Sequence, residues 1–512
     1  MHYSRMLTRI RDLRRLLLLA SLLVGAALIL GQSVLAGDQL PPSIQKILDE
    51  WNVPGEAVSI LVQARGESQP RLRVNAETAR NPASVMKLFT TNAALEALGP
   101  AHTWETRVHA GGPVRDGRLQ GDLWIEGGGD PFLTAEDFWS LLGSLRRRGI
   151  EHIDGDLVFD TSYFQLPAES PGDFDGQPDR VYNLVPHPLL VNFNAMRFEF
   201  EPADGQVRVT TEPVLTNVDV QNRLRVRPGA CGGFQRGIAL NVLEPPGRDR
   251  VMLEGAFPAG CDRYAMTRSV LQPESYAFGL FEQFWRQAGG ELGGHWRTGV
   301  LPSAWAMEGT IFGDNGDDEH SSAVIDSTLL HVHYSRPLGE MVRLVNKYSN
   351  NVMTRHLELT LGAERFEPPA TPAKGRAATL ELLRQHGIDT EGMIIDNPSG
   401  LSRTARLSAR QLGQLLLAAW NGPYMPEFIS SLALSGLDGT VRGRFRDSPA
   451  AGRMHLKTGT IDHVSAIAGY VQSQDNRRFA VVVLVNAPDA HRGPGEEIQD
   501  ALLSWVFSQS AP

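Results

Sequence analysis

Apolar positions after residue 40 recur first at helical and then at strand spacing. Apolar residues three or four positions apart predict a helix over Ser43–Trp51. The mostly apolar run Glu56–Ala64 predicts a buried strand, and Arg71–Asn75 is expected to be its hairpin partner. A strong helix is predicted over Ser84–Leu98, because apolar residues recur along it and a Gly-Pro pair ends it.

A long stretch from about residue 102 to about residue 266 has the pattern of β-structure. Short apolar runs alternate there with Gly, Pro, Asp and Asn: Leu123–Ile125, Leu157–Phe159, Arg197–Phe200, Gln206–Thr210 and Val218–Val226. Ala135–Arg148 is the one clear helix within this stretch, and Pro273–Ala288 is expected to form another after it.

The last third of the chain returns to helices and then ends in strands. The predicted helices are Leu338–Leu361 with a break near Ser349, Ala377–His386, Ala409–Trp420 and Glu496–Phe507. The predicted strands are Met454–Gly459, Val464–Val471 and Arg478–Val485, the last two joined by a turn at Gln474–Asn476. The pattern therefore predicts an α+β fold: helices from both outer thirds flank an antiparallel sheet, and the β-rich middle is an insertion.

Composition places the chain among ordinary globular proteins. Of its 512 residues, 42% are hydrophobic and 21% are charged, which excludes a disordered chain, a collagen and a multi-span membrane protein. The net charge is −9, so we expect no nucleic-acid partner.

Residues 1–36 have the pattern of a secretory signal peptide. Five arginines between Arg5 and Arg15 precede the apolar run Leu16–Leu30, and Val34-Leu35-Ala36 is a small-residue cleavage site. The alternative is an uncleaved N-terminal anchor, so membrane association is expected only if this segment is retained. In both cases the rest of the chain is exported, and we expect a periplasmic protein.

Two cysteines, Cys231 and Cys261, lie within the β-rich middle. Export takes them to an oxidising compartment, so we expect a disulfide between them; the alternative is two free buried thiols. We expect no metal site. Two isolated cysteines do not make a zinc site, and the acidic loop Asp314–Glu319 has Ile325 where an EF-hand starting at Asp314 needs glutamate.

Lysine is rare in this chain, which has five lysines among 49 basic residues. Arginine therefore supplies most positive charges, but only lysine can readily lose its proton. Ser84-Val85-Met86-Lys87 is an S-x-x-K motif that places hydroxyl and amine on one face of a predicted helix. A desolvated, neutral lysine can serve as the base that a serine nucleophile needs. The rival motif Ser43–Lys46 follows two prolines and predicts only a helix start with an exposed lysine.

Two further motifs follow in the chain. Ser349-Asn350-Asn351 is an S-x-N triplet at the expected break between helical segments, and Lys457-Thr458-Gly459 is a K-T-G triplet on an expected strand. Alone, the first is compatible with a helix cap and the second with a turn. Together, in the order S-x-x-K, S-x-N, K-T-G, they indicate one serine-based active site. The chain has no G-x-S-x-G elbow, which disfavours an α/β-hydrolase.

With these motifs the sequence resembles the penicilloyl-serine transferases. Among them it resembles the S13 peptidases, class C low-molecular-mass penicillin-binding proteins with D-alanyl-D-alanine carboxypeptidase and endopeptidase activity. The 265 residues from Ser84 to Ser349 favour this group, because a large insertion between the two motifs is its mark. Further stretches carry the likeness: Asn81–Ser84, Gly127–Pro131, Asn192–Asn194, Asn346–Asn351, Ser399–Ser402 and Gly436–Thr440. The chain departs from the family pattern at Asn397-Pro398, in a loop where an Asp-Gly-Ser-Gly run is usual.

The resemblance implies a β-lactamase/transpeptidase-like domain over residues 37–101 and 305–512, with residues 102–304 as a β-rich insertion in two subdomains. It implies that Ser84 is the nucleophile, Lys87 its base, and Ser349 a proton relay whose hydroxyl Lys457 holds. Asn351 is then expected to bind the amide of the acyl donor. The terminal carboxylate is expected to bind Lys457, Thr458 and Thr460, and the backbone N–H groups of Ser84 and Thr460 are expected to form the oxyanion hole. Gly459 belongs to the same substrate-binding strand.

The resemblance also implies the ligands. Peptidoglycan peptides are the expected substrates and β-lactams the expected inhibitors, and neither a metal nor an organic cofactor is needed. One alternative is a β-lactamase or esterase on the same fold, although no E-x-x-x-N-type loop is evident between the motifs to supply a base for fast deacylation. The other is a periplasmic binding protein without catalytic activity, which the intact Ser84, Lys87 and Lys457 disfavour.

Overall fold

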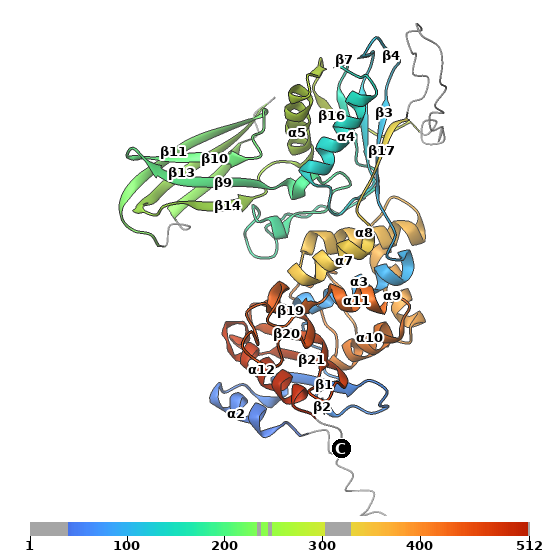
Figure 1. Ribbon diagram of the computed structural model, residues 1–512, viewed down its shortest axis with the longest axis vertical. Helices are drawn as coiled ribbons and strands as arrows, with labels where there is room; N and C mark the ends of the chain where they lie inside the picture. The colour runs from blue at the N-terminus through green and yellow to red at the C-terminus, as the bar shows by residue number, and fades with distance from the viewer. Residues whose placement is uncertain (1–38, 233–236, 244–247, 303–328, 510–512) are drawn as a thin grey trace, which may run out of the picture.

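The computed structural model describes residues 39–232, 237–243, 248–302 and 329–509. The predicted signal peptide and the acidic loop Asp314–Glu319 lie outside these ranges. Figure 1 shows a helix-rich part that contains both ends of the described chain, and an upper part from which one sheet projects sideways.

A six-stranded antiparallel sheet forms the centre of the helix-rich part. Its strands lie in the order β18 (Ala433–Leu434), β19 (Met454–Ile461), β20 (Val464–Gln472), β21 (Arg478–Asn486), β1 (Val58–Ala64) and β2 (Leu72–Val74). Along β21, Val481 and Val483 pack into one apolar cluster while Val482 and Leu484 pack into another, on the opposite face. Burial on both faces explains why this strand is an unbroken apolar run rather than an alternating one.

Helices cover both faces of this sheet (Figure 1). Helices α2 (Pro42–Glu50) and α12 (Pro494–Phe507) lie on one face. The other face carries α3 (Lys87–Leu98), α7 (Leu338–Tyr348), α8 (Asn351–Phe366), α9 (Pro372–Gln385), α10 (Ala409–Asn421) and α11 (Met425–Ser431). The predicted α+β fold is confirmed. The differences from the prediction include α11, which was not expected, and the start of α9 at Pro372 instead of Ala377. The Thr371 hydroxyl caps α9 there by accepting the Lys374 N–H.

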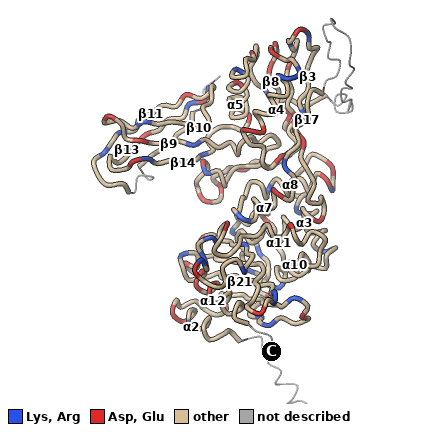
Figure 2. The backbone as a smooth tube through the Cα atoms, in the orientation of Figure 1, with Lys and Arg blue, Asp and Glu red and all other residues tan. Residues whose placement is uncertain are grey.

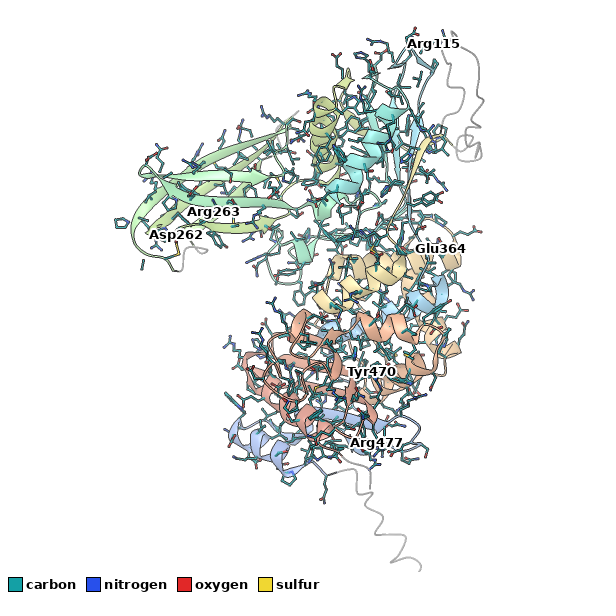
Figure 3. All side chains as sticks on the ribbon, viewed as in Figure 1. Arg115, Asp262, Arg263, Glu364, Tyr470 and Arg477 are labelled. Carbon is teal, nitrogen blue, oxygen red and sulfur yellow. A yellow bond between two sulfur atoms is a disulfide. The ribbon has the colours of Figure 1, made fainter. Side chains whose placement is uncertain are left out.

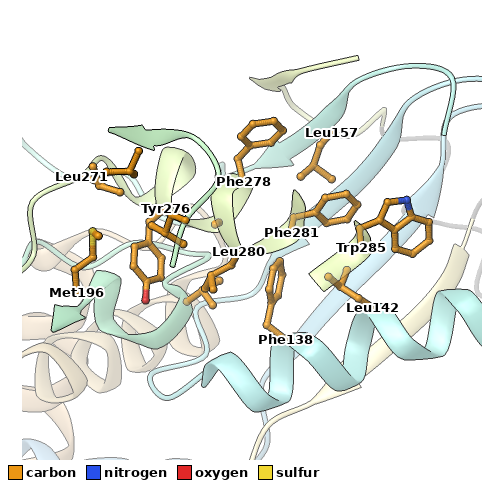
Figure 4. Packing of buried hydrophobic residues seen from close by; sticks show 14 of the residues in the cluster. Phe138, Leu142, Leu157, Met196, Leu271, Tyr276, Phe278, Leu280, Phe281 and Trp285 are labelled. Atoms are coloured by element: carbon orange, nitrogen blue, oxygen red, sulfur yellow. The ribbon is translucent and has the colours of Figure 1, made fainter. Parts of the chain in front are cut away.

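The insertion contains, next to the helix-rich part, two small sheets and two long helices. One sheet has the order β16 (Trp296–Thr298), β8 (Leu157–Asp160), β6 (Leu123–Gly127), β3 (Glu105–Ala110) and β17 (Leu329–Tyr334). The other has the order β15 (Glu291–Leu292), β7 (His152–Ile153), β5 (Arg118–Leu119) and β4 (Val114–Arg115). Figure 4 shows Phe138 and Leu142 of α4 (Ala135–Arg147) packed against Phe281 and Trp285 of α5 (Pro273–Gln287).

A third sheet of the insertion projects from the molecule in Figure 1. Its strand order is β12 (Ile238–Leu243), β13 (Asp249–Gly260), β11 (Val218–Ala230), β10 (Gln206–Glu212), β9 (Met196–Ala203) and β14 (Tyr264–Arg268). Strands β11 and β13 run parallel, and a Cys231–Cys261 disulfide joins the segments that follow them. Asp262 and Arg263, next to this disulfide, mark the far end of the sheet in Figure 3.

The chain leaves the helix-rich part before β3 and returns to it after β17, and these two strands lie side by side. Strand β17 pairs antiparallel with β3, with Tyr334 opposite Glu105, and the Ser335 N–H donates to the Trp104 carbonyl at 2.9 Å. The boundary expected at residue 305 lies outside the described residues, and the strand that follows the gap still belongs to the insertion's sheet. We propose that the chain returns to the helix-rich part after Tyr334, since β17 belongs to the same sheet as β3.

Charge is distributed without a dominant sign. Figure 2 shows Lys and Arg positions interspersed with Asp and Glu positions along the backbone of both parts. Among the helices that the structure describes, none has the length and apolar character needed to cross a membrane.

Candidate active site

Ser84 and Lys87 lie where a short 3-10 helix, η2 (Ala83–Met86), continues into α3. Apolar neighbours bury this junction: Val85, Met86 and Leu88 have no exposed surface, and neither has Lys87. The predicted one-turn spacing places Nζ of Lys87 3.0 Å from Oγ of Ser84.

Three oxygen atoms surround the Lys87 amine. Besides Ser84 Oγ, Nζ lies 2.7 Å from Oδ1 of Asn351 and 2.6 Å from the carbonyl oxygen of Ser399. The amide and carbonyl oxygens can only accept hydrogen bonds, so they take two N–H groups of Lys87. A neutral amine has two N–H groups and one lone pair, and the lone pair then faces the only partner with a proton to give, the Ser84 hydroxyl.

The surroundings favour this neutral form. Burial lowers the pKa of Lys87 well below its ordinary value, and the positive charge of Lys457 lowers it further. Within the described residues no carboxylate forms an ion pair with Lys87. Geometry and electrostatics therefore agree that Lys87 can accept a proton.

Ser349 and Asn351 lie in the break between α7 and α8. Ser349 ends α7 in the left-handed region, with φ of 59°, and the Asn350 side chain caps α8 by accepting the Met353 N–H at 3.0 Å. Asn351 then begins α8 with its side chain beside Lys87. Its Nδ2 donates to the Tyr182 carbonyl at 3.2 Å, which orients its Oδ1 toward the lysine.

Lys457 approaches from β19 on the other side of Ser349. Its Nζ donates to Ser349 Oγ at 2.9 Å and to the Thr458 carbonyl at 2.7 Å. Burial lowers the pKa of Lys457 to about 7. This lysine therefore changes charge near neutral pH while it holds the Ser349 hydroxyl.

Two glycines allow other segments to lie directly against the backbone of Ser84. A Cβ at Gly459 would lie 2.8 Å from the Ser84 nitrogen and 2.7 Å from the Pro82 oxygen. Gly400 has φ of +76°, and a Cβ there would overlap the Ala83 carbonyl. Glycine at these positions brings β19 and the 396–402 loop to the nucleophile from two sides.

A pocket of about 560 Å³ opens from Ser84 toward β19. Its walls include Ser349, Thr458 and Thr460. They also include Thr440, whose hydroxyl accepts a hydrogen bond from Thr458 Oγ1 at 2.7 Å. The pocket thus presents hydroxyl groups beside a buried cation, an arrangement suited to a carboxylate.

The three motifs predicted from the sequence therefore meet at one place. Lys87 bonds to Ser84 and Asn351, and Lys457 bonds to Ser349. Ser84 and Ser349 line the same pocket, and Thr458, Gly459 and Thr460 follow Lys457 on β19. The rival pair lies elsewhere, on α2. Its Ser43 is exposed, and the Lys46 side chain is 75% exposed and pairs with Glu50.

Sequence reasoning did not find three of the neighbours. The carbonyl oxygens of Ser399 and Tyr182 hold Lys87 and Asn351, and Thr440 binds Thr458. Ser399 and Thr440 lie in stretches that carry the family resemblance, which was the available signal. The role of a backbone carbonyl cannot be predicted from residue type, because every residue has one.

One group of described side chains brings three potential metal ligands together: His463, Asp489 and His491, with ligand atoms within 4.8 Å of one another. However, Nδ1 of His463 accepts the Asp489 N–H at 3.1 Å, and Nδ1 of His491 accepts the His463 N–H at 2.9 Å. A neutral imidazole has one free lone pair, and both are already used. The group is therefore arranged as a hydrogen-bonded junction of two loops and not as a metal site.

The chain is similar to known proteins along most of its length. A model of the D-Ala-D-Ala carboxypeptidase 3 (S13) family matches residues 40–508. A D-alanyl-D-alanine carboxypeptidase from Actinomadura sp. (strain R39) is 29% identical over 436 residues, covering 82% of this chain and 76% of its own length. The D-alanyl-D-alanine carboxypeptidase DacB of Haemophilus influenzae is 24% identical over 436 residues, covering 84% of this chain and 86% of its own.

A solved structure shares the fold. The crystal structure of penicillin binding protein 4 (dacB) from H. influenzae superposes with a TM-score of 0.74 at 22% identity, over 91% of this chain and 99% of the other. The same protein complexed with a β-lactam gives a TM-score of 0.72 at 22% identity, over 92% and 100%.

Proposed function

Since the chain belongs to the D-Ala-D-Ala carboxypeptidase 3 (S13) family, we propose that Ser84 is the nucleophile with which it cleaves D-alanyl-D-alanine peptides. The protein is a serine-type peptidase of this class. One observation carries the assignment of Ser84: two N–H groups of Lys87 are taken by the oxygens of Asn351 and Ser399, which leaves the lysine lone pair for the serine proton.

In the first step, Ser84 Oγ attacks the carbonyl carbon of the penultimate D-alanine while Lys87 takes its proton. General-base assistance of this kind contributes about 10²–10⁴-fold. The backbone N–H groups of Ser84 and Thr460 bind the developing oxyanion. Loss of one such donor typically lowers the rate by about 10²–10³-fold. The close approach that Gly459 permits supports this pairing of η2 with β19.

In the second half of acylation the C–N bond breaks and the amine leaves with a proton. The proton that Lys87 took from Ser84 reaches the amine through the Ser349 hydroxyl, and Lys457 holds this hydroxyl in place. The carboxylate next to the leaving amine binds Lys457, Thr458 and Thr460 in the hydroxyl-lined pocket. Asn351 binds the peptide amide of the acyl donor, and a water molecule then hydrolyses the acyl-enzyme.

The biological substrates follow from this chemistry. We propose peptidoglycan stem peptides and their D-alanyl cross-links as substrates, and the periplasm as the place where the exported enzyme meets them. β-Lactams resemble a D-alanyl-D-alanine terminus, so they acylate Ser84, and the resulting acyl-enzyme is hydrolysed slowly. The complex of the H. influenzae protein with a β-lactam supports this expectation.

Intact-mass analysis after incubation with a penicillin tests the proposal. We expect one adduct of the mass of the penicillin, stable for the duration of the measurement, and peptide mapping should assign it to Ser84. An adduct on Ser43, or none, contradicts the assignment of the nucleophile. Rapid loss of the adduct with turnover of the penicillin would instead identify a β-lactamase.

A further inference from the structure

A second pocket, of about 280 Å³, lies apart from the hydroxyl-lined pocket, between helices α8 and α9 and the loops 166–169 and 396–401. Pockets that hold drug-sized ligands have volumes of about 300–1,000 Å³, and this pocket is slightly smaller, so only a small molecule fits. Its walls combine apolar groups (Leu166, Pro167, Leu359, Pro372, Pro398 and Leu401) with charged ones (Glu169, Arg355, Glu358, Arg376 and Asp396).

Two of the charged side chains have no partner among the described residues. Glu358 is only 3% exposed, and its carboxyl makes neither a hydrogen bond nor an ion pair within the described part of the chain. The same holds for the guanidinium of Arg376, whose Nε is buried without an acceptor. Although both line one pocket, they do not approach within ion-pair distance of each other.

The other charged groups of the pocket are already engaged. Arg355 pairs with Glu169, and Asp396 accepts hydrogen bonds from Ser402 at 2.6 Å and from Thr404 at 2.9 Å. Glu358 and Arg376 are therefore the groups that remain for a ligand.

An unpaired acid and an unpaired guanidinium in one buried pocket cost free energy unless a third group joins them. Burial raises the pKa of Glu358 to about 8, although the positive charges of Arg376 and Arg355 lower it. The acid therefore keeps its proton at neutral pH until a cation comes close. A ligand that brings an ammonium to Glu358 and a carboxylate to Arg376 would satisfy both.

We propose that this pocket binds a small free α-amino acid as its zwitterion. Its ammonium pairs with Glu358, its carboxylate with Arg376, and its side chain lies among Leu359, Pro398 and Leu401. D-Alanine, the amino acid released from a D-alanyl-D-alanine terminus, has this chemistry and this size. The assignment of the pocket stands on its own geometry and does not rest on the proposed function.

Equilibrium dialysis with radiolabelled D-alanine tests the inference. The full-length exported protein is first treated with a penicillin, and intact mass verifies that the active site is blocked. We expect one saturable site. Propionate, which has only the carboxylate, makes no ion pair with Glu358, and ethylamine, which has only the ammonium, leaves the Arg376 guanidinium unpaired. Each should therefore compete at least about tenfold less well than unlabelled D-alanine.

Variants then locate the site. Glu358→Gln and Arg376→Gln should each weaken binding at least about tenfold, and circular dichroism verifies that they are folded. The matched controls are Glu364→Gln and Arg365→Gln, exposed residues of the same helix α8, and they should bind as the wild type does; Glu364 is labelled in Figure 3.

Three outcomes overturn the inference: no saturable binding, equal competition by propionate, or wild-type binding by both pocket variants. A protein that no penicillin acylates contradicts the proposed function instead. The comparison of Glu358→Gln with Glu364→Gln still assigns the amino-acid site in that case.

Discussion

Nζ of Lys347 donates to Oδ2 of Asp438 at 2.6 Å, and this ion pair joins the last turn of α7 to the turn that precedes Thr440. The Lys347 amine is nearly buried and also donates to the Leu432 carbonyl. A Cβ at Gly439 would lie 2.7 Å from the Lys347 carbonyl oxygen, so the turn lies directly against the helix end. One contact thus sets the positions of Ser349, two residues beyond Lys347, and of Thr440, two residues beyond Asp438.

Removing the Lys347 charge is expected to cost both stability and catalysis. Lys347→Met leaves the Leu432 carbonyl and the Asp438 carboxylate without their common donor, at a cost of about 1.5–3 kcal/mol in the free energy of unfolding. Urea denaturation measures this change, and fluorescent-penicillin labelling measures the accompanying loss of acylation rate. Lys46→Met is the matched control and should change neither quantity, because Lys46 is exposed. A stable Lys347→Met variant with wild-type labelling would show that the ion pair positions nothing.

Lys87→Arg tests the base. Arginine keeps the positive charge but has a pKa above about 12, so it cannot accept the Ser84 proton at neutral pH. The acylation rate should fall by at least about 10²–10⁴-fold, as measured by fluorescent-penicillin labelling. Because arginine is also larger, Lys87→Gln is the companion variant and should lose a comparable factor. Lys46→Arg should label at the wild-type rate; labelling of Lys87→Arg at that rate contradicts the mechanism.

The preference of the enzyme for a substrate with a free C-terminal carboxylate should depend on pH. Lys457 binds this carboxylate only when charged, and burial lowers the pKa of Lys457 to about 7. The ratio of kcat/KM for a peptide acid to that for its C-terminal amide should therefore be large below pH 7 and fall as the pH rises through about 7, because kcat/KM reports the free enzyme. An amide that is cleaved as well as the acid at pH 6 removes Lys457 and Thr458 from this role.

Gly459→Ala should separate β19 from the nucleophile. The added Cβ would meet backbone atoms of Pro82 and Ser84 at 2.7–2.8 Å, and backbone cannot move aside as a flexible side chain can. We expect the acylation rate to fall by about 10²–10³-fold, the effect of losing one oxyanion donor. Gly55→Ala is the control, since a Cβ there meets nothing within 4 Å. Equal labelling rates for the two variants would count against an oxyanion site shared by Ser84 and Thr460.

The Cys231–Cys261 disulfide should stabilise the projecting sheet without affecting catalysis. It spans 30 residues, and a loop of that length gives about 3–4 kcal/mol in the chain-entropy model. Cys231→Ser/Cys261→Ser should therefore open this sheet more often, seen as faster amide hydrogen exchange in β11 and β13. Penicillin labelling should stay at the wild-type rate because the site lies in the other part of the molecule. A loss of labelling would reveal coupling between the two parts.

Local pattern was enough to predict most elements of the helix-rich part. The unbroken apolar run of β21, the turn at Gln474–Asn476 and the helical spacing of α10 each act within a few residues, and the structure confirms all three. The pairing of the insertion was not predictable in the same way. Strand β17 pairs with β3 across more than 200 residues, and β11 pairs parallel with β13, because these partners are chosen by three-dimensional packing that periodicity does not encode.

The candidate site shows the same contrast between features that the sequence predicts and features that depend on three-dimensional packing. The chemistry-bearing side chains were predicted because residue type and order carry the signal: a serine and a lysine one turn apart, and a second lysine on a strand. The atoms that decide the protonation of Lys87 were not predicted. The Ser399 carbonyl reaches Lys87 because the 396–402 loop lies close to the nucleophile. The residue type of Ser399 does not predict which backbone atom will face the amine.

The paired strands β3 and β17 place the entry and the exit of the insertion side by side. Glu105 lies opposite Tyr334 there, so the length and fold of the segment between Trp104 and Ser335 can change without moving these two ends apart. Segments whose ends meet in this way can be gained, lost or exchanged as whole modules during evolution. The projecting sheet is therefore free to diversify, whereas the part of the insertion that contributes the Tyr182 carbonyl to Asn351 is tied to the S-x-x-K, S-x-N and K-T-G segments around Ser84.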